Sequence, residues 1–299
     1  MKTLSLMCTL ILAFQISPSQ EHKTVDQEAR NQAFPFMGNN SPVPDGYTFR
    51  CAAGYPVYGD DRMPVIGRFS LGLAGVLELG YSNEGYIGNP IGMTRPANSW
   101  DAKIQIFKQR EELPSVALWA RGTIGWQNED LGAYALWAVL PSFFNFGVVG
   151  TRYEFSSMTV GLSMAPGLGK WITMNLSVGY QELSSRNLWI LIAPAPIIGN
   201  GYHAVSGDRS GMLEASANIV AGLLPQLALV AQAGTLPYFN VNPTALTLEV
   251  GRAYNGAVGV RYTLPIPLSV DSYVRWQSNI NGKTDTQFRL GLSSEIPLL

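Results

Sequence analysis

Residues 172–181 read Ile-Thr-Met-Asn-Leu-Ser-Val-Gly-Tyr-Gln, and this strict alternation of apolar and small polar residues decides the fold. Side chains of a β-strand point alternately to its two faces, so one face of this segment is apolar and the other is polar. Segments of about ten residues with the same alternation recur from about Thr48 to the C-terminus. A soluble sandwich would bury each apolar face under a second sheet, but here nearly every segment alternates and its polar face is small and hydrophilic. The pattern predicts an all-β, antiparallel up-and-down barrel that crosses a membrane, with lipid outside and water or polar side chains inside.

The N-terminus has the features of an export signal. Lys2 supplies a positive charge, residues 3–16 form an apolar stretch, and Ser-Pro-Ser at 17–19 is a small-residue cleavage site. An N-terminal membrane anchor is the alternative, but the apolar run is too short to span a bilayer comfortably. We therefore expect a signal peptide at 1–19, a periplasmic lead-in or plug at 20–44, and a barrel at 45–299 in a bacterial outer membrane.

The composition excludes several classes of function. Only 14% of the residues are charged and the net charge is −1, so nothing in the chain favours a nucleic-acid partner. The two histidines, His22 and His203, are too few for a histidine-based metal site, and we expect no cofactor. After removal of the signal peptide only Cys51 remains, so no disulfide framework is possible.

Fourteen segments fit the strand pattern, and an even number is usual for bacterial single-chain barrels. Without the first two segments, whose pattern is weaker, the count would be twelve. Residues 245–264 contain Asn255-Gly256, a hairpin signal, but their apolar residues keep one parity, so we expect one long strand there. The segments are 47–55, 66–73, 76–83, 100–108, 115–126, 133–146, 157–164, 171–182, 187–194, 212–223, 226–235, 245–264, 269–278 and 286–296.

The connections between these segments differ in length. Short links predict the periplasmic side and long links, rich in Gly, Asn and Pro, predict the outside. Large aromatic residues near strand ends suggest girdles at the two membrane surfaces, although ordinary cross-strand packing is the alternative. The short links are 74–75, 111–114, 184–186, 224–225 and 265–268, the long links are 86–99, 197–211 and 236–244, and the aromatic residues are Trp100, Trp126, Trp171 and Tyr180.

Three short stretches resemble known outer-membrane barrels. Residues 72–81, Gly-Leu-Ala-Gly-Val-Leu-Glu-Leu-Gly-Tyr, resemble the "GLTDRLELG" turn of many Gram-negative barrels, including YjbH-like proteins and transporters associated with phenol degradation. Residues 113–118, Leu-Pro-Ser-Val-Ala-Leu, resemble the "LPALALG" start of a strand, and residues 287–293 resemble the last strand of the same proteins. The resemblance implies a porin-like barrel in outer-membrane lipid, inserted by the barrel-assembly machinery, and it names no substrate. One departure is the ending Pro297-Leu298-Leu299, which replaces the terminal aromatic residue typical of assembly signals.

The alternation also places charged residues on the inner wall. Arg261, Arg275 and Arg289 belong to the last three strands, and closure of the barrel would bring Arg50 and Arg68 beside them. Arginine presents fixed donors to carboxylate and phosphate, so this wall predicts a path for anionic solutes. The alternative is that inward arginine and acidic side chains pair and simply fill the lumen. The candidate lumen-lining residues are Arg50, Arg68, Arg121, Arg261, Arg275, Arg289, Glu78 and Asp271, and Lys103, Asp101, Glu214 and Glu249 share their inward parity.

The residues favour transport over catalysis. His203 has Ser206 and Ser210 nearby, but in a predicted loop, whereas a nucleophile and its base must be held rigidly within hydrogen-bond reach. We therefore expect no enzyme, but a monomeric, passive channel or transporter for small solutes whose lumen sets selectivity. The alternative is a non-conducting barrel that acts as a scaffold in envelope assembly or polymer export.

Overall fold

The structure is a computed structural model that describes residues 43–44, 46–58, 66–87, 95–108, 114–130, 147–166, 168, 171–192, 201–242, 247–278 and 284–298. The expected signal peptide, most of the lead-in and the strand expected at 133–146 lie outside these residues. Within the described part of the chain, no helix is long and apolar enough to cross a membrane.

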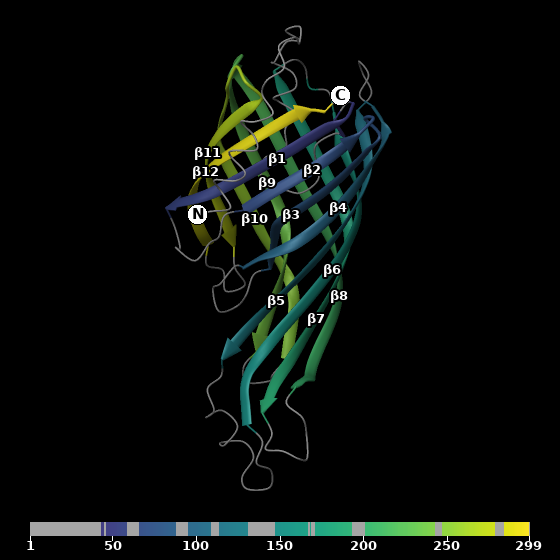
Figure 1. Ribbon diagram of the computed structural model, residues 1–299, viewed down its shortest axis with the longest axis vertical. Helices are drawn as coiled ribbons and strands as arrows, with labels where there is room; N and C mark the ends of the chain where they lie inside the picture. Colours follow the sequence, from purple (N-terminus) through teal and green to yellow (C-terminus); the bar gives the residue numbers. More distant parts are fainter. Residues whose placement is uncertain are drawn as a thin grey trace.

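The described residues form twelve antiparallel strands, each paired with the next, and β1 pairs with β12 to close a barrel (Figure 1). Closure begins where Thr48 lies opposite Pro297. The strands are β1 Thr48–Tyr58, β2 Ile66–Leu73, β3 Leu77–Ile87, β4 Arg95–Phe107, β5 Ser115–Asp130, β6 Gly147–Ala165, β7 Ile172–Ile192, β8 Gly201–Leu224, β9 Leu227–Asn242, β10 Thr247–Thr263, β11 Leu268–Ser278 and β12 Thr284–Pro297.

Twelve strands is the alternative count from the sequence, and the preferred count of fourteen is wrong. Two expected strands, at 171–182 and 187–194, are one strand, because Ser184 in the expected link pairs with both β6 and β8. β5 and β6 are direct neighbours in the barrel, since Asp130 pairs with Gly150. The first two strands are both present as β1 and β2. The long strand at 245–264 is confirmed as β10, with Asn255 and Gly256 inside it.

The ends of the strands show which way the barrel faces. The short turns at 74–76, 225–226 and 264–267 lie at the end where Thr48 and Pro297 meet. Barrels of this class keep their short turns in the periplasm, so this end is periplasmic. The long connections lie at the opposite end, but they are shorter than expected because β8 already begins at Gly201 and β9 continues to Asn242.

The strands differ greatly in length. β2 has 8 residues, whereas β6, β7 and β8 have 19, 21 and 24. In Figure 1 the group β5–β8 extends far beyond the other strands at the end opposite to the short turns. Outward residues on β7 change from apolar to charged where this extension starts, since Val178 is followed by Glu182 and Arg186, all exposed.

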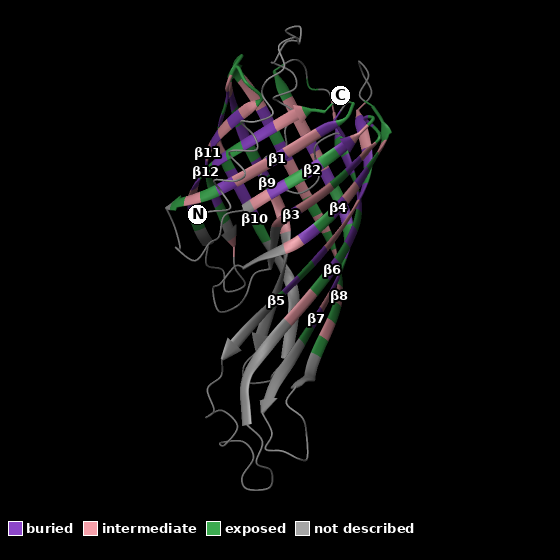
Figure 2. Ribbon diagram, viewed as in Figure 1, coloured by how far each residue is buried: buried purple, intermediate pink, exposed green. Residues whose placement is uncertain are grey.

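The predicted alternation is present in the structure. On β7 the inward side chains of Asn175, Ser177 and Gln181 are buried, and the outward side chains of Val178 and Tyr180 are exposed. Figure 2 shows buried and exposed residues alternating along the strands. Apolar side chains are exposed outward on the other strands as well, such as Leu71, Leu79, Ile104, Leu118, Val160, Leu213, Leu229, Val258, Val274 and Leu290. A soluble protein does not expose an apolar belt of this extent, so the barrel is an outer-membrane barrel surrounded by lipid.

Aromatic residues border this apolar belt. Trp100, Trp126, Trp171 and Tyr180 are all exposed, as expected of girdle residues at the headgroup level. Some of them also pack across strands: the ring centroids of Tyr81 and Trp100 are 5.8 Å apart. Girdle placement and cross-strand packing therefore occur together.

The described end of the lead-in enters the periplasmic mouth of the barrel. Val43 and Pro44 are buried, and the Val43 N–H donates a hydrogen bond to Gln105 Oε1 at 3.1 Å. Pro44 lies on inward-facing Gly72, where an added Cβ would be only 2.4 Å from Pro44 Cγ. A larger residue at Gly72 would therefore displace the chain from this position.

The lumen is narrow at one level. β3 and β9 are six strands apart around the ring, yet their Cα atoms approach within 8 Å of each other. Inward side chains on both sides of the barrel are correspondingly buried, and Phe155, Leu183 and Met212 form a small apolar cluster among them.

Candidate functional site

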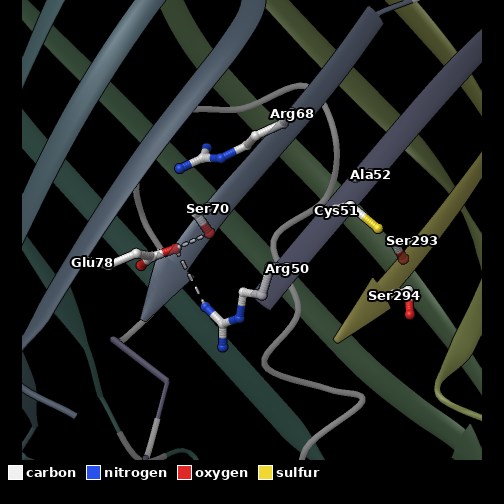
Figure 3. A pocket seen from close by; sticks show the side chains of 8 residues that line it. All are labelled: Arg50, Cys51, Ala52, Arg68, Ser70, Glu78, Ser293 and Ser294. Atoms are coloured by element: carbon white, nitrogen blue, oxygen red, sulfur yellow. Dashed lines mark hydrogen bonds and ion pairs between the residues drawn. The ribbon is translucent and has the colours of Figure 1, made fainter. Parts of the chain in front are cut away.

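The inner wall of β1–β4 carries an ionic cluster centred on Glu78. Ser70 Oγ donates to Glu78 Oε1 at 2.6 Å, and Arg50 Nη1 lies 3.8 Å from the same oxygen (Figure 3). Lys103 Nζ donates to Glu78 Oε2 at 3.5 Å from the neighbouring strand. These groups converge because Gly72 and Glu78 pair across β2 and β3, and Glu78 and Lys103 pair across β3 and β4.

Two further ion pairs complete this cluster. Arg50 Nε donates to Glu295 Oε2 at 2.7 Å, and Arg68 Nη2 donates to Asp101 Oδ2 at 3.4 Å. The β1–β4 cluster thus joins three cations to three carboxylates, Arg50, Arg68 and Lys103 with Glu78, Asp101 and Glu295. Buried charges are tolerated only when they are paired, so this cluster neutralises itself.

A small hollow lies beside the cluster. Arg50, Arg68 and Glu78 border it, together with Ser293 and Ser294 from β12 (Figure 3). Cys51 also borders it and is buried, in keeping with the role of a small hydrophobic residue.

The β10–β12 wall holds the other predicted arginines. Arg261 donates two hydrogen bonds to Asp271, from Nε to Oδ1 at 2.6 Å and from Nη2 to Oδ2 at 3.0 Å. Both side chains are buried. Arg289 Nε donates to Gln287 Oε1 at 2.9 Å on the same strand. Arg275 lies opposite Gln287 in the β11–β12 register and is buried.

Arg121 stands apart from these arginines. Its guanidinium reaches from β5 over β6 and β7 to form an ion pair with Glu214 on β8, and Thr159 Oγ1 donates to the same carboxylate at 3.2 Å. The guanidinium carbon also lies 5.5 Å from the centroid of the Trp119 ring. Trp119 lies against Gly161 and Gly179, where an added Cβ would be 2.8 Å and 3.1 Å from its Cζ2. Because these two glycines have no side chains, the Trp119 ring can lie along the inner wall beside the Arg121–Glu214 ion pair.

All eight candidate lumen residues lie on the inner face of the barrel, but they do not form one site. Closure places Arg50 opposite Glu295 on β12, six residues along that strand from Arg289, and Arg121 belongs to a separate pair. Sequence reasoning missed Glu295, although it shares the inward parity of Arg289 and Gly291. His203 and Ser206, expected in a loop, lie within β8. Among the described residues, no group of His, Cys, Asp or Glu is arranged to hold a metal ion.

Among the described inward side chains at the level of the apolar belt, cations outnumber carboxylates. Among the described side chains there, seven cations face five carboxylates, a difference of two. The cations are Arg50, Arg68, Lys103, Arg121, Arg261, Arg275 and Arg289, and the carboxylates are Glu78, Asp101, Glu214, Asp271 and Glu295.

Comparisons with known proteins give only distant likenesses. No protein-family model matches the chain, and no curated protein matches it in sequence. Solved structures that match include the CymD monoaromatic hydrocarbon channel, at 10% identity and a TM-score of 0.42 over 86% of this chain and 89% of that one. The translocator domain of the autotransporter NalP from Neisseria meningitidis matches at 9% identity and 0.41 over 83% and 86%, and the NanC porin at 7% and 0.41 over 84% and 100%. At this distance the matches carry no function to this chain, and the resemblance to YjbH-like proteins stays a prediction.

Proposed function

We propose that the protein is an outer-membrane channel for small solutes and that it favours anions. The observation that carries this proposal is the polar, charged interior of a closed barrel, in which seven cations face five carboxylates among the described side chains. In this proposal its partners are outer-membrane lipid, the barrel-assembly machinery and the solute.

The argument for anions is electrostatic. A lumen with low-dielectric walls concentrates ions of the sign opposite to its net charge. Arg275 and Arg289 lie on neighbouring strands of the same wall, and both are buried there. The guanidinium group suits carboxylate and phosphate, so small organic anions fit this wall as well as chloride.

The narrow interior bears on conductance. The approach of β3 to β9 and the buried inward side chains narrow the lumen at that level. We therefore expect small conductance steps, well below those of wide porins.

The test is single-channel recording in planar bilayers under a potassium chloride gradient. We expect discrete steps, and a reversal potential that shows chloride passing more readily than potassium. The double variant Arg275→Ala/Arg289→Ala removes the excess of two charges and is expected to bring the permeability ratio close to one. The double variant Arg261→Leu/Asp271→Leu is the matched control, since it removes one charge of each sign from the same wall. A cation preference that is the same in the wild type and the Arg275→Ala/Arg289→Ala variant contradicts anion selectivity.

A second candidate function is a non-conducting barrel that acts as a scaffold in the envelope. The contact between β3 and β9 favours this candidate, since it closes part of the lumen. Bilayers that contain folded protein and give no steps would support the scaffold over the channel.

A further inference from the structure

A single row of hydrogen-bonding side chains runs around half of the inner wall. In the strand register Asn175 pairs with Asn218, and Asn218 pairs with Gln232. The row continues through Ala257 to Arg275 and ends at Gln287. We call five of these residues the polar row: Asn175 on β7, Asn218 on β8, Gln232 on β9, Arg275 on β11 and Gln287 on β12. Each of these side chains is 2–3% exposed.

The three amides on β7–β9 do not satisfy one another. Asn175 Oδ1 and Asn218 Oδ1 have no hydrogen-bond partner, and neither do Oε1 and Nε2 of Gln232. Asn255 Oδ1, next to Gly234 in the adjoining row, is in the same condition. Buried polar groups are normally hydrogen-bonded, and those that are not call for an explanation. Gln181, also buried on β7, shows the ordinary case, since its Nε2 donates to Ser157 Oγ at 3.4 Å.

The chemistry of these groups selects a class of ligand. An amide accepts hydrogen bonds at its oxygen and donates them from its nitrogen. A hydroxyl group can donate to the amide oxygen and accept from the amide nitrogen. An apolar solute would leave the amide atoms without partners, which is costly. A simple anion would interact with Arg275 and would not supply donors to the amide oxygens.

We propose that the polar row binds a small polyhydroxylated solute, of the class of monosaccharides and sugar alcohols, on its way through the barrel. The amides of β7–β9 hold its hydroxyl groups, with one amide on each of three adjacent strands that lie about 4.8 Å apart. This inference rests on the proposed channel and names the solute for it. Arg275 at the far end of the row makes a hydroxylated acid compatible with the same wall.

The experiment compares two uncharged solutes in proteoliposomes. Sorbitol has many hydroxyl donors, whereas a poly(ethylene glycol) of equal hydrodynamic size has mainly ether acceptors. We expect wild-type vesicles to swell faster in sorbitol. The triple variant Asn175→Leu/Asn218→Leu/Gln232→Leu is expected to lower the sorbitol rate roughly two- to tenfold, which corresponds to the net free energy of one hydrogen bond. The rate for the poly(ethylene glycol) is expected to stay unchanged.

Gln181→Leu is the matched control, since it removes a buried inward amide that already has a partner, and it is expected to keep the sorbitol preference. Heat-modifiable mobility on a gel reports whether each variant is folded, and the single variant Asn218→Leu replaces the triple variant if the latter does not insert.

Chloride conductance, recorded on the same preparations, separates the two proposals. If chloride steps appear but sorbitol and the poly(ethylene glycol) enter at equal rates, or if the leucine variants keep the preference, the polar row binds only water and the inference is overturned. If neither chloride nor sorbitol passes through folded wild-type protein, the proposed channel itself fails.

Discussion

The β1–β4 cluster and the polar row bury polar side chains in the same barrel, but they treat them in opposite ways. In the cluster each carboxylate lies beside a cation. Glu78 by itself makes three contacts, with Ser70, Arg50 and Lys103. In the polar row the amides of Asn175, Asn218 and Gln232 keep atoms without partners. The difference separates an interior surface that is complete by itself from one that a solute can complete. Charged residues are the more conspicuous features of the lumen, but it is the uncharged amides that keep buried atoms without partners.

The largest effect is expected at the centre of the β1–β4 cluster. Glu78→Gln keeps the shape of the side chain and removes its charge, which leaves the buried Lys103 without its carboxylate partner. We expect the free energy of unfolding to fall by about 3–5 kcal/mol, as measured by urea unfolding in lipid vesicles. Glu295→Gln, at the more exposed edge of the cluster, is the control and is expected to cost less. Equal and small losses at both positions would remove the distinction between the two regions.

The Arg261–Asp271 pair offers a second way to break the comparison. Arg261→Leu leaves Asp271 buried without its bidentate partner, and we expect a loss of about 3 kcal/mol. The double variant Arg261→Leu/Asp271→Leu is expected to lie close to the wild type, because an apolar pair replaces both charges and their desolvation. A double-mutant cycle on unfolding free energies measures the coupling. Additive losses would mean that the pair does not stabilise the wall as a unit.

Much of this arrangement follows from the period of two. Alternation predicts the strands, the closed barrel and the inward parity of residues such as Arg289 and Asp271, because a pleated strand leaves no other choice. It fails at β7, where the outward residues become polar at Glu182, Ser184 and Arg186 although the backbone pairing continues. The end of the apolar outward residues therefore marks where β7 leaves the lipid, and the strand itself continues beyond that point.

The contacts of the site were beyond the sequence for a different reason. Arg50 meets Glu295 only because the closing strands adopt one register out of several. Arg121 reaches Glu214 across two strands beside the Trp119 ring, for which Gly161 and Gly179 leave room. The polar row likewise depends on the registers of five strand pairs, none of which alternation specifies.

The smallest stability effect, and one of opposite sign, is expected in the polar row. Asn218→Leu replaces an amide whose oxygen lacks a partner by an apolar side chain of similar size. We expect the free energy of unfolding to stay unchanged or to rise by about 1 kcal/mol, since an unmet buried polar group is removed. The same urea assay measures it, and Gln181→Leu, which breaks an existing hydrogen bond, is expected to lower stability. A clear loss of stability in Asn218→Leu would show that its amide is satisfied after all.

The unequal strand lengths have a consequence for how the molecule meets its surroundings. β8 is 16 residues longer than β2, the difference between 24 and 8, and at the usual rise this is about 50 Å along the strand. The outer rim is therefore oblique, with a high shoulder over β6–β8 and its low side over β1 and β2. In atomic-force images of oriented molecules, each barrel is expected to appear as one off-centre peak beside its pore.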